Sequence, residues 1–273
     1  MTRIGIFDSG VGGLSVWREI NRQMPQLSVM YLGDQGHVPY GPRPLLEVRR
    51  FAEEITRFLL GKGAQLIVVA CNAASAAALR HLRETFPETP FVGMEPAVKP
   101  AAEHTHSGVV GVLATPATFQ GELYASVVER FAGDVTVLQD VCPGLVKQIE
   151  AGKLDSPETE EILRKALDPM LQAGIDTVVL GCTHYPFVIP LIQKIAGAEV
   201  RVIDPAPAVA RQAQRLLEQI HAPTDSTEKP ENVFYTTGDT AQFDAFIHAS
   251  LGRSDRSVAL HWTADCQLSE ATS

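Results

Sequence analysis

Residues 66–72 read LIVVACN, an apolar run that ends in Cys71 and Asn72. Residues 177–183 repeat the pattern as TVVLGCT, with a small residue before Cys182. Both runs are rich in β-branched residues and precede a helix-compatible stretch, as in the strand-to-helix turns of parallel sheets. The two cysteines are separated by about the length of one domain. The repeat therefore predicts two related α/β lobes, each with a cysteine at the carboxyl end of a strand.

The rest of the chain alternates between short apolar runs and longer amphipathic stretches, which is typical of βα units around parallel sheets. The predicted strands are residues 4–7, 29–32, 66–70, 91–93, 109–113, 135–138, 177–180 and 201–203. The predicted helices are residues 45–60, 73–86, 117–131, 158–173 and 208–220. The later predictions are a linker or exposed loop at 222–231, a strand at 233–237, a helix at 240–250, a strand at 258–261 and a frayed tail at 265–273.

Two helix starts carry a hydroxyl residue directly before a proline. Thr115 precedes Pro116, and Ser156 precedes Pro157. Proline suits the first position of a helix, and a hydroxyl just before it can accept a hydrogen bond from a free amide of the first turn. We expect both hydroxyls to cap their helices.

The composition is that of a globular protein with a substantial core, because 45% of the residues are hydrophobic and 20% are charged. The formal charge of −9 argues against a general nucleic-acid binder, although it leaves room for a small anionic substrate. No apolar run approaches the roughly 18–20 residues that span a bilayer, and the sequence opens on a predicted strand rather than a signal peptide. We expect a cytoplasmic protein with no nucleic-acid or membrane partner.

The four cysteines are far apart in the sequence and form no Cys-x-x-Cys pair, so we expect neither a disulfide framework nor a structural zinc site. Cys142 and Cys266 fit the usual place of a free cysteine, as small buried apolar side chains. Cys71 and Cys182 differ, because they lie at the sheet edge where ligands bind in α/β folds. Each also comes just before a helix-compatible stretch, whose amides stabilise a thiolate.

Residues near the two cysteines could manage their protons. His184 lies two positions after Cys182, where the alternative is a structural histidine. Asp8 ends the first predicted strand and precedes a glycine-rich turn at 9–13. The turn begins like a dinucleotide-binding motif, but the third glycine is replaced by Ser15. The turn is therefore interpreted as a site for a small carboxylate or amine, with a βα turn that binds nothing as the alternative.

Several other polar residues have purely structural interpretations when they are taken singly. Residues 39–41 (PYG) form a rigid turn-rich loop. Thr115 and Thr118 could be a helix cap and an exposed hydroxyl. Glu150, near the end of a predicted helix from residue 143, would ordinarily be solvated surface.

Together these pieces resemble the cofactor-independent aspartate/glutamate racemase family over nearly the whole chain, to about residue 218. The motifs are residues 7–15 (FDSGVGGLS), 39–41 (PYG), 69–72 (VACN), 114–118 (ATPAT) and 180–186 (LGCTHYP). The resemblance implies an α/β fold with two pseudo-symmetric lobes, each a mostly parallel sheet flanked by helices, and an active site in the cleft between them. It implies that residues 1–95 plus 208–273 form the first lobe and that residues 96–207 form the second.

The activity that the resemblance implies is interconversion of L- and D-glutamate, without cofactor or metal, to supply D-glutamate for peptidoglycan. One cysteine, as thiolate, takes the α-hydrogen, and the other, as thiol, delivers a proton to the opposite face. The resemblance implies that Asp8 assists Cys71, that His184 assists Cys182 and that Glu150 lies near the latter. It also implies a homodimer.

The substrate contacts follow from the same resemblance. Asn72 and Thr183 would hold the α-carboxylate, while Ser9, Tyr40 and Gly41 would hold the side-chain carboxylate. The whole predicted substrate-binding set is Asp8, Ser9, Tyr40, Gly41, Asn72, Ala73, Thr115, Thr118, Thr183 and His184.

Residue 73 departs from the family pattern, which usually has threonine after Cys-Asn. Here Ala73 keeps the amide but lacks the hydroxyl. Loss of one hydrogen bond to a charged group costs about 1.5–3 kcal/mol if nothing replaces it. Ser75 is the nearest hydroxyl, but two positions along a helix we expect it to point elsewhere.

Three alternatives stay open at this point. The first is an aspartate or hydantoin racemase of the same superfamily, which residues 39–41 and the turn at Asp8 and Ser9 disfavour. The second is a related decarboxylase, which would need only one of the two cysteines. The third is a two-lobed protein that clamps an acidic amino acid without catalysis, for which neither Cys71 nor Cys182 would be essential.

Overall fold

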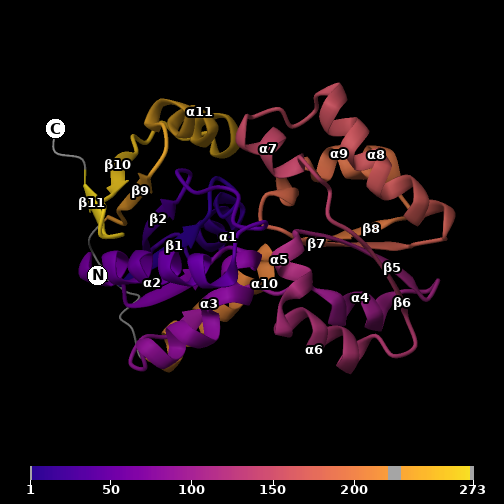
Figure 1. Cartoon of the computed structure of the whole chain (residues 1–273), viewed down its shortest axis with the longest axis horizontal. Coiled ribbons are helices and arrows are strands. Elements are labelled where there is room, and N and C mark those ends of the chain that lie inside the picture. Colours follow the sequence, from indigo (N-terminus) through magenta and orange to yellow (C-terminus); the bar gives the residue numbers. More distant parts are fainter. Residues whose placement is uncertain (1, 221–228, 271–273) are drawn as a thin grey trace.

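A computed structural model describes residues 2–220 and 229–270, which form two sheets flanked by helices (Figure 1). The larger sheet has the strand order β11-β10-β9-β2-β1-β3-β4, and all its neighbouring strands are parallel except β10 and β11. Its strands are β1 (Arg3–Asp8), β2 (Ser28–Gly33), β3 (Leu66–Val69), β4 (Phe91–Val92), β9 (Asn232–Thr236), β10 (Val258–Trp262) and β11 (Leu268–Glu270). This sheet therefore combines both ends of the described chain.

The smaller sheet is parallel throughout and has the order β6-β5-β7-β8. Its strands are β5 (Val109–Ala114), β6 (Thr136–Asp140), β7 (Thr177–Gly181) and β8 (Arg201–Ile203). We call the larger sheet with its helices the first lobe and the smaller sheet with its helices the second lobe. The predicted fold class, two parallel sheets flanked by helices, is confirmed.

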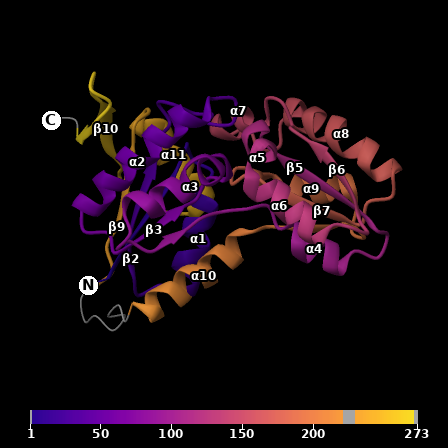
Figure 2. The ribbon, with the colours of Figure 1, turned by 60° about the horizontal axis from the view of Figure 1, so that its bottom comes forward.

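Helices cover both sheets. Those of the first lobe are α1 (Leu14–Gln23), α2 (Leu45–Gly61), α3 (Asn72–Thr85), α10 (Ala206–Gln219) and α11 (Thr240–Leu251). Those of the second lobe are α4 (Val98–His104), α5 (Pro116–Gln120), α6 (Glu122–Phe131), α7 (Leu145–Glu150), α8 (Pro157–Gln172), α9 (Ile189–Ala196) and a 3-10 turn, η1 (Tyr185–Val188). Helix α10 leads back from β8 to the first lobe and packs along α1 (Figure 2).

Local sequence explains the central elements. The strands β1, β2, β3 and β7 are buried along nearly their whole length, and their sequences are near-continuous apolar runs, as expected for parallel strands covered on both faces. Helix α2 buries Val48, Phe51, Ile55 and Leu59, which recur at helical spacing and face the sheet. The cores of both lobes are therefore set by periodicity that is visible in the sequence.

The predicted strands and helices agree closely with the structure, but helices α1, α4 and α9 were not predicted, and the end of the chain differs. The tail predicted as frayed is wrong at Leu268–Glu270, because these residues pair antiparallel with β10 as β11. Residues 271–273 and most of the predicted 222–231 loop lie outside the described residues. Cys266 is exposed rather than buried, whereas Cys142 is buried as predicted.

The helix predicted at 117–131 is in fact two helices that meet at Gly121. The backbone of Gly121 is extended, so the first helix stops there after one turn and a second begins. Of the two predicted hydroxyl caps, Ser156 accepts a hydrogen bond from the amide of Thr159 and is confirmed. Thr115 makes no such bond, because its hydroxyl lies 3.1 Å from that of Thr118. No helix in the described part of the chain combines the length and the apolarity that crossing a membrane would require.

Candidate active site

The two cysteines of the sequence repeat lie on opposite lobes and line one pocket. Cys71 follows β3 and is the residue before α3, where its sulfur accepts a hydrogen bond from the Ala74 amide at 3.4 Å. Cys182 follows β7, and both side chains are 5% exposed. The pocket has a volume of about 20 Å³ and is lined by Ser9, Pro39, Tyr40, Gly41, Cys71, Asn72, Ala73, Thr115, Val146, Cys182, Thr183 and His184. Two thiols from different sheets therefore share one small, sheltered space.

His184 connects Cys182 to Glu150. Its Nδ1 lies 3.8 Å from the Cys182 sulfur, and its Nε2 lies 2.5 Å from the Glu150 carboxylate. Burial alone would lower the pKa of His184, but hydrogen bonds with Cys182 and Glu150 raise it well above its ordinary value. A protonated imidazole beside a thiol favours the thiolate form.

Glu150 is held by groups from the first lobe. Its Oε1 accepts a hydrogen bond from the Val11 amide at 2.8 Å, and its Oε2 accepts one from Gln35 Nε2 at 2.9 Å. Burial acts to raise the pKa of Glu150, but the hydrogen bond and charge of His184 outweigh it and lower the pKa. The alternative of a solvated surface glutamate is wrong, because Glu150 joins the two lobes.

Asp8 ends β1 deep inside the molecule. Its two carboxylate oxygens accept hydrogen bonds from the Gly10 amide at 2.9 Å and from the Thr183 hydroxyl at 2.8 Å. Burial raises the pKa of Asp8, although the His184 charge and these hydrogen bonds oppose it. Asp8 thus links the first lobe to the segment that follows Cys182, and it acts on Cys71 through its charge.

Cys71 lies in a different environment from Cys182. Burial and the negative charge of Asp8 both raise the pKa of the Cys71 thiol well above its ordinary value. The Cys71 thiol donates to the hydroxyl oxygen of Ser9, which lies 4.0 Å from the sulfur. The structure therefore favours the protonated thiol at Cys71.

Asn72 presents unused hydrogen-bonding capacity to the pocket. It is 3% exposed, and its side-chain nitrogen and oxygen both lack a hydrogen-bond partner among the described residues. A buried amide without partners is costly, at roughly 1–3 kcal/mol for each group. Such a group at the wall of a pocket is typical of a site that awaits a polar ligand.

Residues 39–41 form a bridge between the lobes. The Tyr40 hydroxyl donates to Asp34 at 2.6 Å, and the Gly41 carbonyl accepts a hydrogen bond from the Ala117 amide at 3.2 Å. A Cβ on Gly41 would lie 2.8 Å from that of Thr115, so glycine permits the close approach. The loop therefore closes the pocket against α5.

The remaining predicted site residues lie around this pocket with different exposures to it. Thr115 lines the pocket, while Thr118 is buried behind it and donates to the Gly181 carbonyl at 3.4 Å. Ala73 lines the pocket as well. Ser75 points away as expected, because its hydroxyl donates to the Val69 carbonyl at 3.1 Å.

Sequence reasoning missed Val11, Gln35 and Val146. Val11 contributes through its amide and Gln35 through a contact 115 residues away in the chain, so no local pattern marks either of them. Val146 lies on the short helix α7 and lines the pocket as an apolar wall. The described residues contain no cluster of three or more His, Cys, Asp or Glu side chains that could hold a metal ion.

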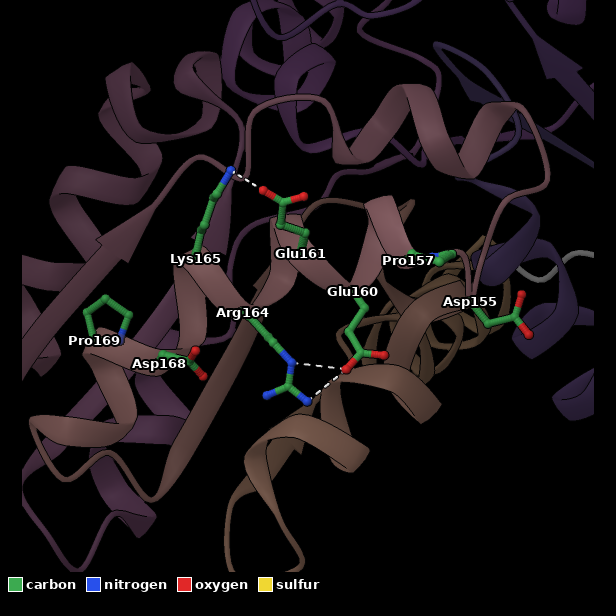
Figure 3. A pocket seen from close by; sticks show the side chains of 8 residues that line it. All are labelled: Asp155, Pro157, Glu160, Glu161, Arg164, Lys165, Asp168 and Pro169. Atoms are coloured by element: carbon green, nitrogen blue, oxygen red, sulfur yellow. Dashed lines mark hydrogen bonds and ion pairs between the residues drawn. The ribbon is translucent and has the colours of Figure 1, made fainter.

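A much wider hollow of about 570 Å³ lies on the outer face of α8 (Figure 3). Its side chains pair with each other at helical spacing, as in Lys165 with Glu161 and Arg164 with Glu160. Lys165 and Glu161 are 74% and 65% exposed. This hollow is interpreted as a solvated helix face, remote from both pocket cysteines.

The sequence and the fold are both similar to those of known racemases. The family model for Asp/Glu/hydantoin racemases matches residues 4–213. A glutamate racemase of Roseiflexus sp. (strain RS-1) is 50% identical over 90% of each chain. The crystal structure of the glutamate racemase isoform RacE1 from Bacillus anthracis is similar with a TM-score of 0.83 and 34% identity, covering 94% of this chain and 97% of that one.

A second solved structure is that of Escherichia coli glutamate racemase in complex with L-glutamate and the activator UDP-MurNAc-ala. It has a TM-score of 0.82 and 32% identity, and the alignment covers 93% of this chain and 96% of that one. The sequence match extends over most of the chain, and the structural match extends over both lobes. The chain belongs to the Asp/Glu/hydantoin racemase family.

Proposed function

We propose that this chain interconverts L- and D-glutamate, with Cys71 and Cys182 as the two groups that transfer the proton. The observation that carries the proposal is the convergence of two buried cysteines, from the ends of β3 and β7, on one pocket. The substrate is supported by the relatives, which are glutamate racemases, and by the Escherichia coli structure with L-glutamate bound.

The reaction needs one proton acceptor and one proton donor on opposite faces of the α-carbon. In one direction the Cys182 thiolate takes the α-hydrogen as a proton, so that an S–H bond forms and the electron pair of the C–H bond stays on carbon. The Cys71 thiol then gives its proton to the other face and becomes a thiolate. The reverse direction exchanges the two roles.

The environments of the two thiols suit this starting arrangement. The His184 imidazole lies 3.8 Å from the Cys182 sulfur, where it can exchange a proton with it, and the raised pKa of Cys71 favours the thiol. For the reverse direction, the ammonium group of a bound amino acid would add a positive charge near Cys71 and favour its thiolate. Asp8, through its charge, opposes that ionisation until the substrate is bound.

The α-hydrogen of an amino acid is weakly acidic, so the pocket has to stabilise the carbanion. Burial of both thiols excludes water, and fixed donors in a dry site stabilise developing charge more than they would in water. We propose that Asn72 holds the α-carboxylate, together with the amides of Ala73 and Thr183. The unpartnered amide of Asn72 supports this role. The proposal includes no cofactor and no metal.

The side-chain carboxylate of glutamate would be held by Ser9 and by residues 40–41, close to Thr115. The Tyr40 hydroxyl already donates its proton to Asp34, so it is not free to donate to the substrate. We therefore assign the contribution of residues 40–41 chiefly to the backbone of Gly41. The Thr183 hydroxyl likewise donates to Asp8, which leaves its amide for substrate. These roles are proposals that follow from the positions around the pocket.

The pocket volume of about 20 Å³ is enough for about one water molecule and is smaller than glutamate. We therefore propose that the two lobes separate to admit substrate and close again before chemistry. Residues 1–95 plus 208–273 would move as the first lobe, and residues 96–207 would move as the second. The residues that follow Val92 and Ile203 connect the lobes and would contain the hinge.

Three wider proposals accompany the activity. D-glutamate made by the enzyme would enter peptidoglycan, the protein would act in the cytoplasm, and it would form a homodimer. Leu45 and Leu46 on α2 are 37% and 66% exposed, and apolar side chains of this kind are suited to an interface between subunits. Light scattering on the purified protein measures the oligomeric state directly.

The test of the activity is an assay with D- and L-glutamate in heavy water and no added cofactor. Circular dichroism should report inversion from either enantiomer, and mass spectrometry should find one deuterium at the α-carbon of each inverted product. Faster inversion of aspartate would move the substrate assignment to the neighbouring branch of the family. Binding without inversion would support the non-catalytic alternative.

A further inference from the structure

We propose that Gln35 is a positioning residue for proton transfer at Cys182. It acts by holding Glu150, which in turn holds the imidazole of His184. The inference rests on the proposed function, because it concerns one of the two proton transfers of that reaction.

The contacts form a continuous chain of hydrogen bonds. The Gly238 amide donates to the Thr236 hydroxyl oxygen at 3.0 Å, and that hydroxyl donates to Gln35 Oε1 at 2.8 Å. Gln35 Nε2 donates to Glu150 Oε2 at 2.9 Å. Glu150 Oε1 lies 2.5 Å from His184 Nε2, and His184 Nδ1 lies 3.8 Å from the Cys182 sulfur.

The direction of this chain is fixed at the Glu150 end, because the carboxylate can only accept and therefore faces Gln35 Nε2. Gln35 Oε1 then accepts the proton of the Thr236 hydroxyl, whose oxygen accepts from the Gly238 amide. The amide group of Gln35 is thereby oriented with its nitrogen toward Glu150. Gln35 is suited to this place because it accepts at one end and donates at the other.

The hydrogen bond from Gln35 to Glu150 helps to determine which nitrogen of His184 donates to Glu150. The Glu150 carboxylate accepts from Gln35 at one oxygen and from the Val11 amide at the other, and these bonds together with His184 lower its pKa, so it is ionised and can only accept from His184. His184 Nε2 must therefore donate to Glu150, which leaves Nδ1 facing Cys182. Nδ1 is therefore the nitrogen that can pass a proton to and from the Cys182 sulfur.

The holding groups and the held groups come from different lobes. Gln35 follows β2, and Thr236 ends β9, both in the first lobe, whereas Glu150 ends α7 in the second. The Glu150 side chain is 11% exposed, so the hydrogen bond from Gln35 is largely sheltered from water. Gln35 therefore reaches Glu150 across the boundary between the lobes, beside the pocket.

Two nearly isosteric changes test the role. Gln35→Met keeps the length of the side chain without its amide, and Thr236→Val keeps the shape without the hydroxyl. Both are expected to reduce kcat, by up to about a hundredfold for Gln35→Met, because small displacements of catalytic groups are costly. The two enantiomers are equally stable, so kcat/KM must fall equally in both directions and cannot by itself identify the affected step.

Isotope effects identify the step. With α-deuterated glutamate, Gln35→Met should raise the primary isotope effect in the direction in which Cys182 removes the α-hydrogen. In the opposite direction the primary effect should fall toward one, and the solvent isotope effect should rise, because Cys182 then delivers a solvent proton. Cys182→Ser assigns the directions, since it abolishes α-hydrogen exchange from the enantiomer that Cys182 deprotonates.

The matched control is Thr237→Val, at the next position along the chain. The Thr237 hydroxyl donates to Asp34 at 2.7 Å and its oxygen accepts from the Gly36 amide at 2.9 Å, so it touches the backbone beside Gln35 but makes no hydrogen bond with the Gln35 side chain. Its isotope effects should equal those of the unaltered protein, and Thr236→Ser, which keeps a hydroxyl, should restore the values lost in Thr236→Val.

If Gln35→Met and Thr236→Val lose rate while their isotope effects stay unchanged, the inference is overturned. The two residues would then have a purely structural role. That outcome differs from failure of the proposed function, in which the unaltered protein would not invert glutamate at all and both proposals would fall. Should Gln35→Met not fold, Thr236→Val alone decides between the two outcomes.

Discussion

The carboxylate of Glu150 lies 2.5 Å from the Nε2 atom of His184, and the two side chains are only 11% and 3% exposed. An ion pair this deeply buried is weak evidence for stability relative to an apolar pair, but removal of one partner is costly. The pair also lies one contact from Cys182. The same two residues should therefore influence folding and chemistry in ways that can be measured separately.

Glu150→Gln is expected to lower the free energy of unfolding by roughly 3–5 kcal/mol, as when one member of a buried pair is lost. The loss should be largest between about pH 4.5 and 6.5, the ordinary pKa values of Glu150 and His184. The raised pKa of His184 stabilises the fold fully below 6.5 and is lost as the pH rises through the folded value. The lowered pKa of Glu150 stabilises it above 4.5 and is lost as the pH falls through the folded value.

Denaturant unfolding across this pH range measures the difference between the two proteins. Glu161→Gln is the matched control, because Glu161 pairs with Lys165 at 65% and 74% exposure, where solvent screens the pair and its loss should hardly change stability. A stability difference for Glu150→Gln that does not vary with pH would contradict the assigned charge states.

Cys71→Ser and Cys182→Ser are each expected to reduce racemisation by about 10²–10⁴-fold, the contribution of a positioned acid or base. A serine hydroxyl is a much weaker acid than a thiol, so one of the two proton transfers fails. Exchange of the α-hydrogen in heavy water should persist for one enantiomer in Cys71→Ser and for the other in Cys182→Ser. Nuclear magnetic resonance of the recovered substrate measures how much of its α-hydrogen has been exchanged for deuterium. Turnover that survives both replacements together would refute the two-thiol mechanism.

Gly12→Ala is expected to lower kcat strongly while the protein stays folded. A Cβ at this position would overlap the imidazole ring of His184, including its Nδ1 atom, and would push the ring from Cys182. Steady-state kinetics with either enantiomer measures the loss. The control is Gly61→Ala, where a Cβ meets no atom within 4 Å and the fold should be unchanged or slightly more stable. Equal kinetics for Gly12→Ala and the unaltered protein would contradict the ring position.

Asn72→Ala is expected to raise the KM for glutamate by about tenfold to a hundredfold, which corresponds to the loss of one hydrogen bond to a charged group. The thermal unfolding midpoint should hardly change, because the Asn72 side chain has no partner among the described residues to lose. Calorimetric unfolding and initial-rate kinetics give the two numbers. A large loss of stability with an unchanged KM would exclude the proposed substrate contact.

The parts of the fold that the sequence predicts are those whose pattern is local. The strands β3 and β7, each followed by a cysteine, can be predicted because strands that are buried on both faces are nearly all apolar. The boundary at Gly121 was missed because apolar spacing continues through it, while one extended residue suffices to end the helix. The short strand β11 was missed because three residues of an edge strand carry little periodicity.

The residues of the candidate site likewise fall into those that local sequence predicts and those that it does not. Cys71, Asn72, Cys182 and His184 lie next to strand ends, where position alone marks them as candidates. Gln35 has no such mark, because its importance comes from a contact with Glu150 in the other lobe. Contacts of that kind depend on how the lobes pack against each other, which local apolar periodicity does not predict.

The place of β9 in the larger sheet has a consequence for synthesis. β9 pairs with β2, although the whole of the smaller sheet, to Ile203, lies between them in the chain. A chain that emerges from the ribosome can therefore complete the smaller sheet while one edge of β2 is still open. That edge belongs to a buried apolar strand, the type most prone to pair with other chains. Premature termination before residue 232 should therefore give aggregation rather than a smaller folded enzyme.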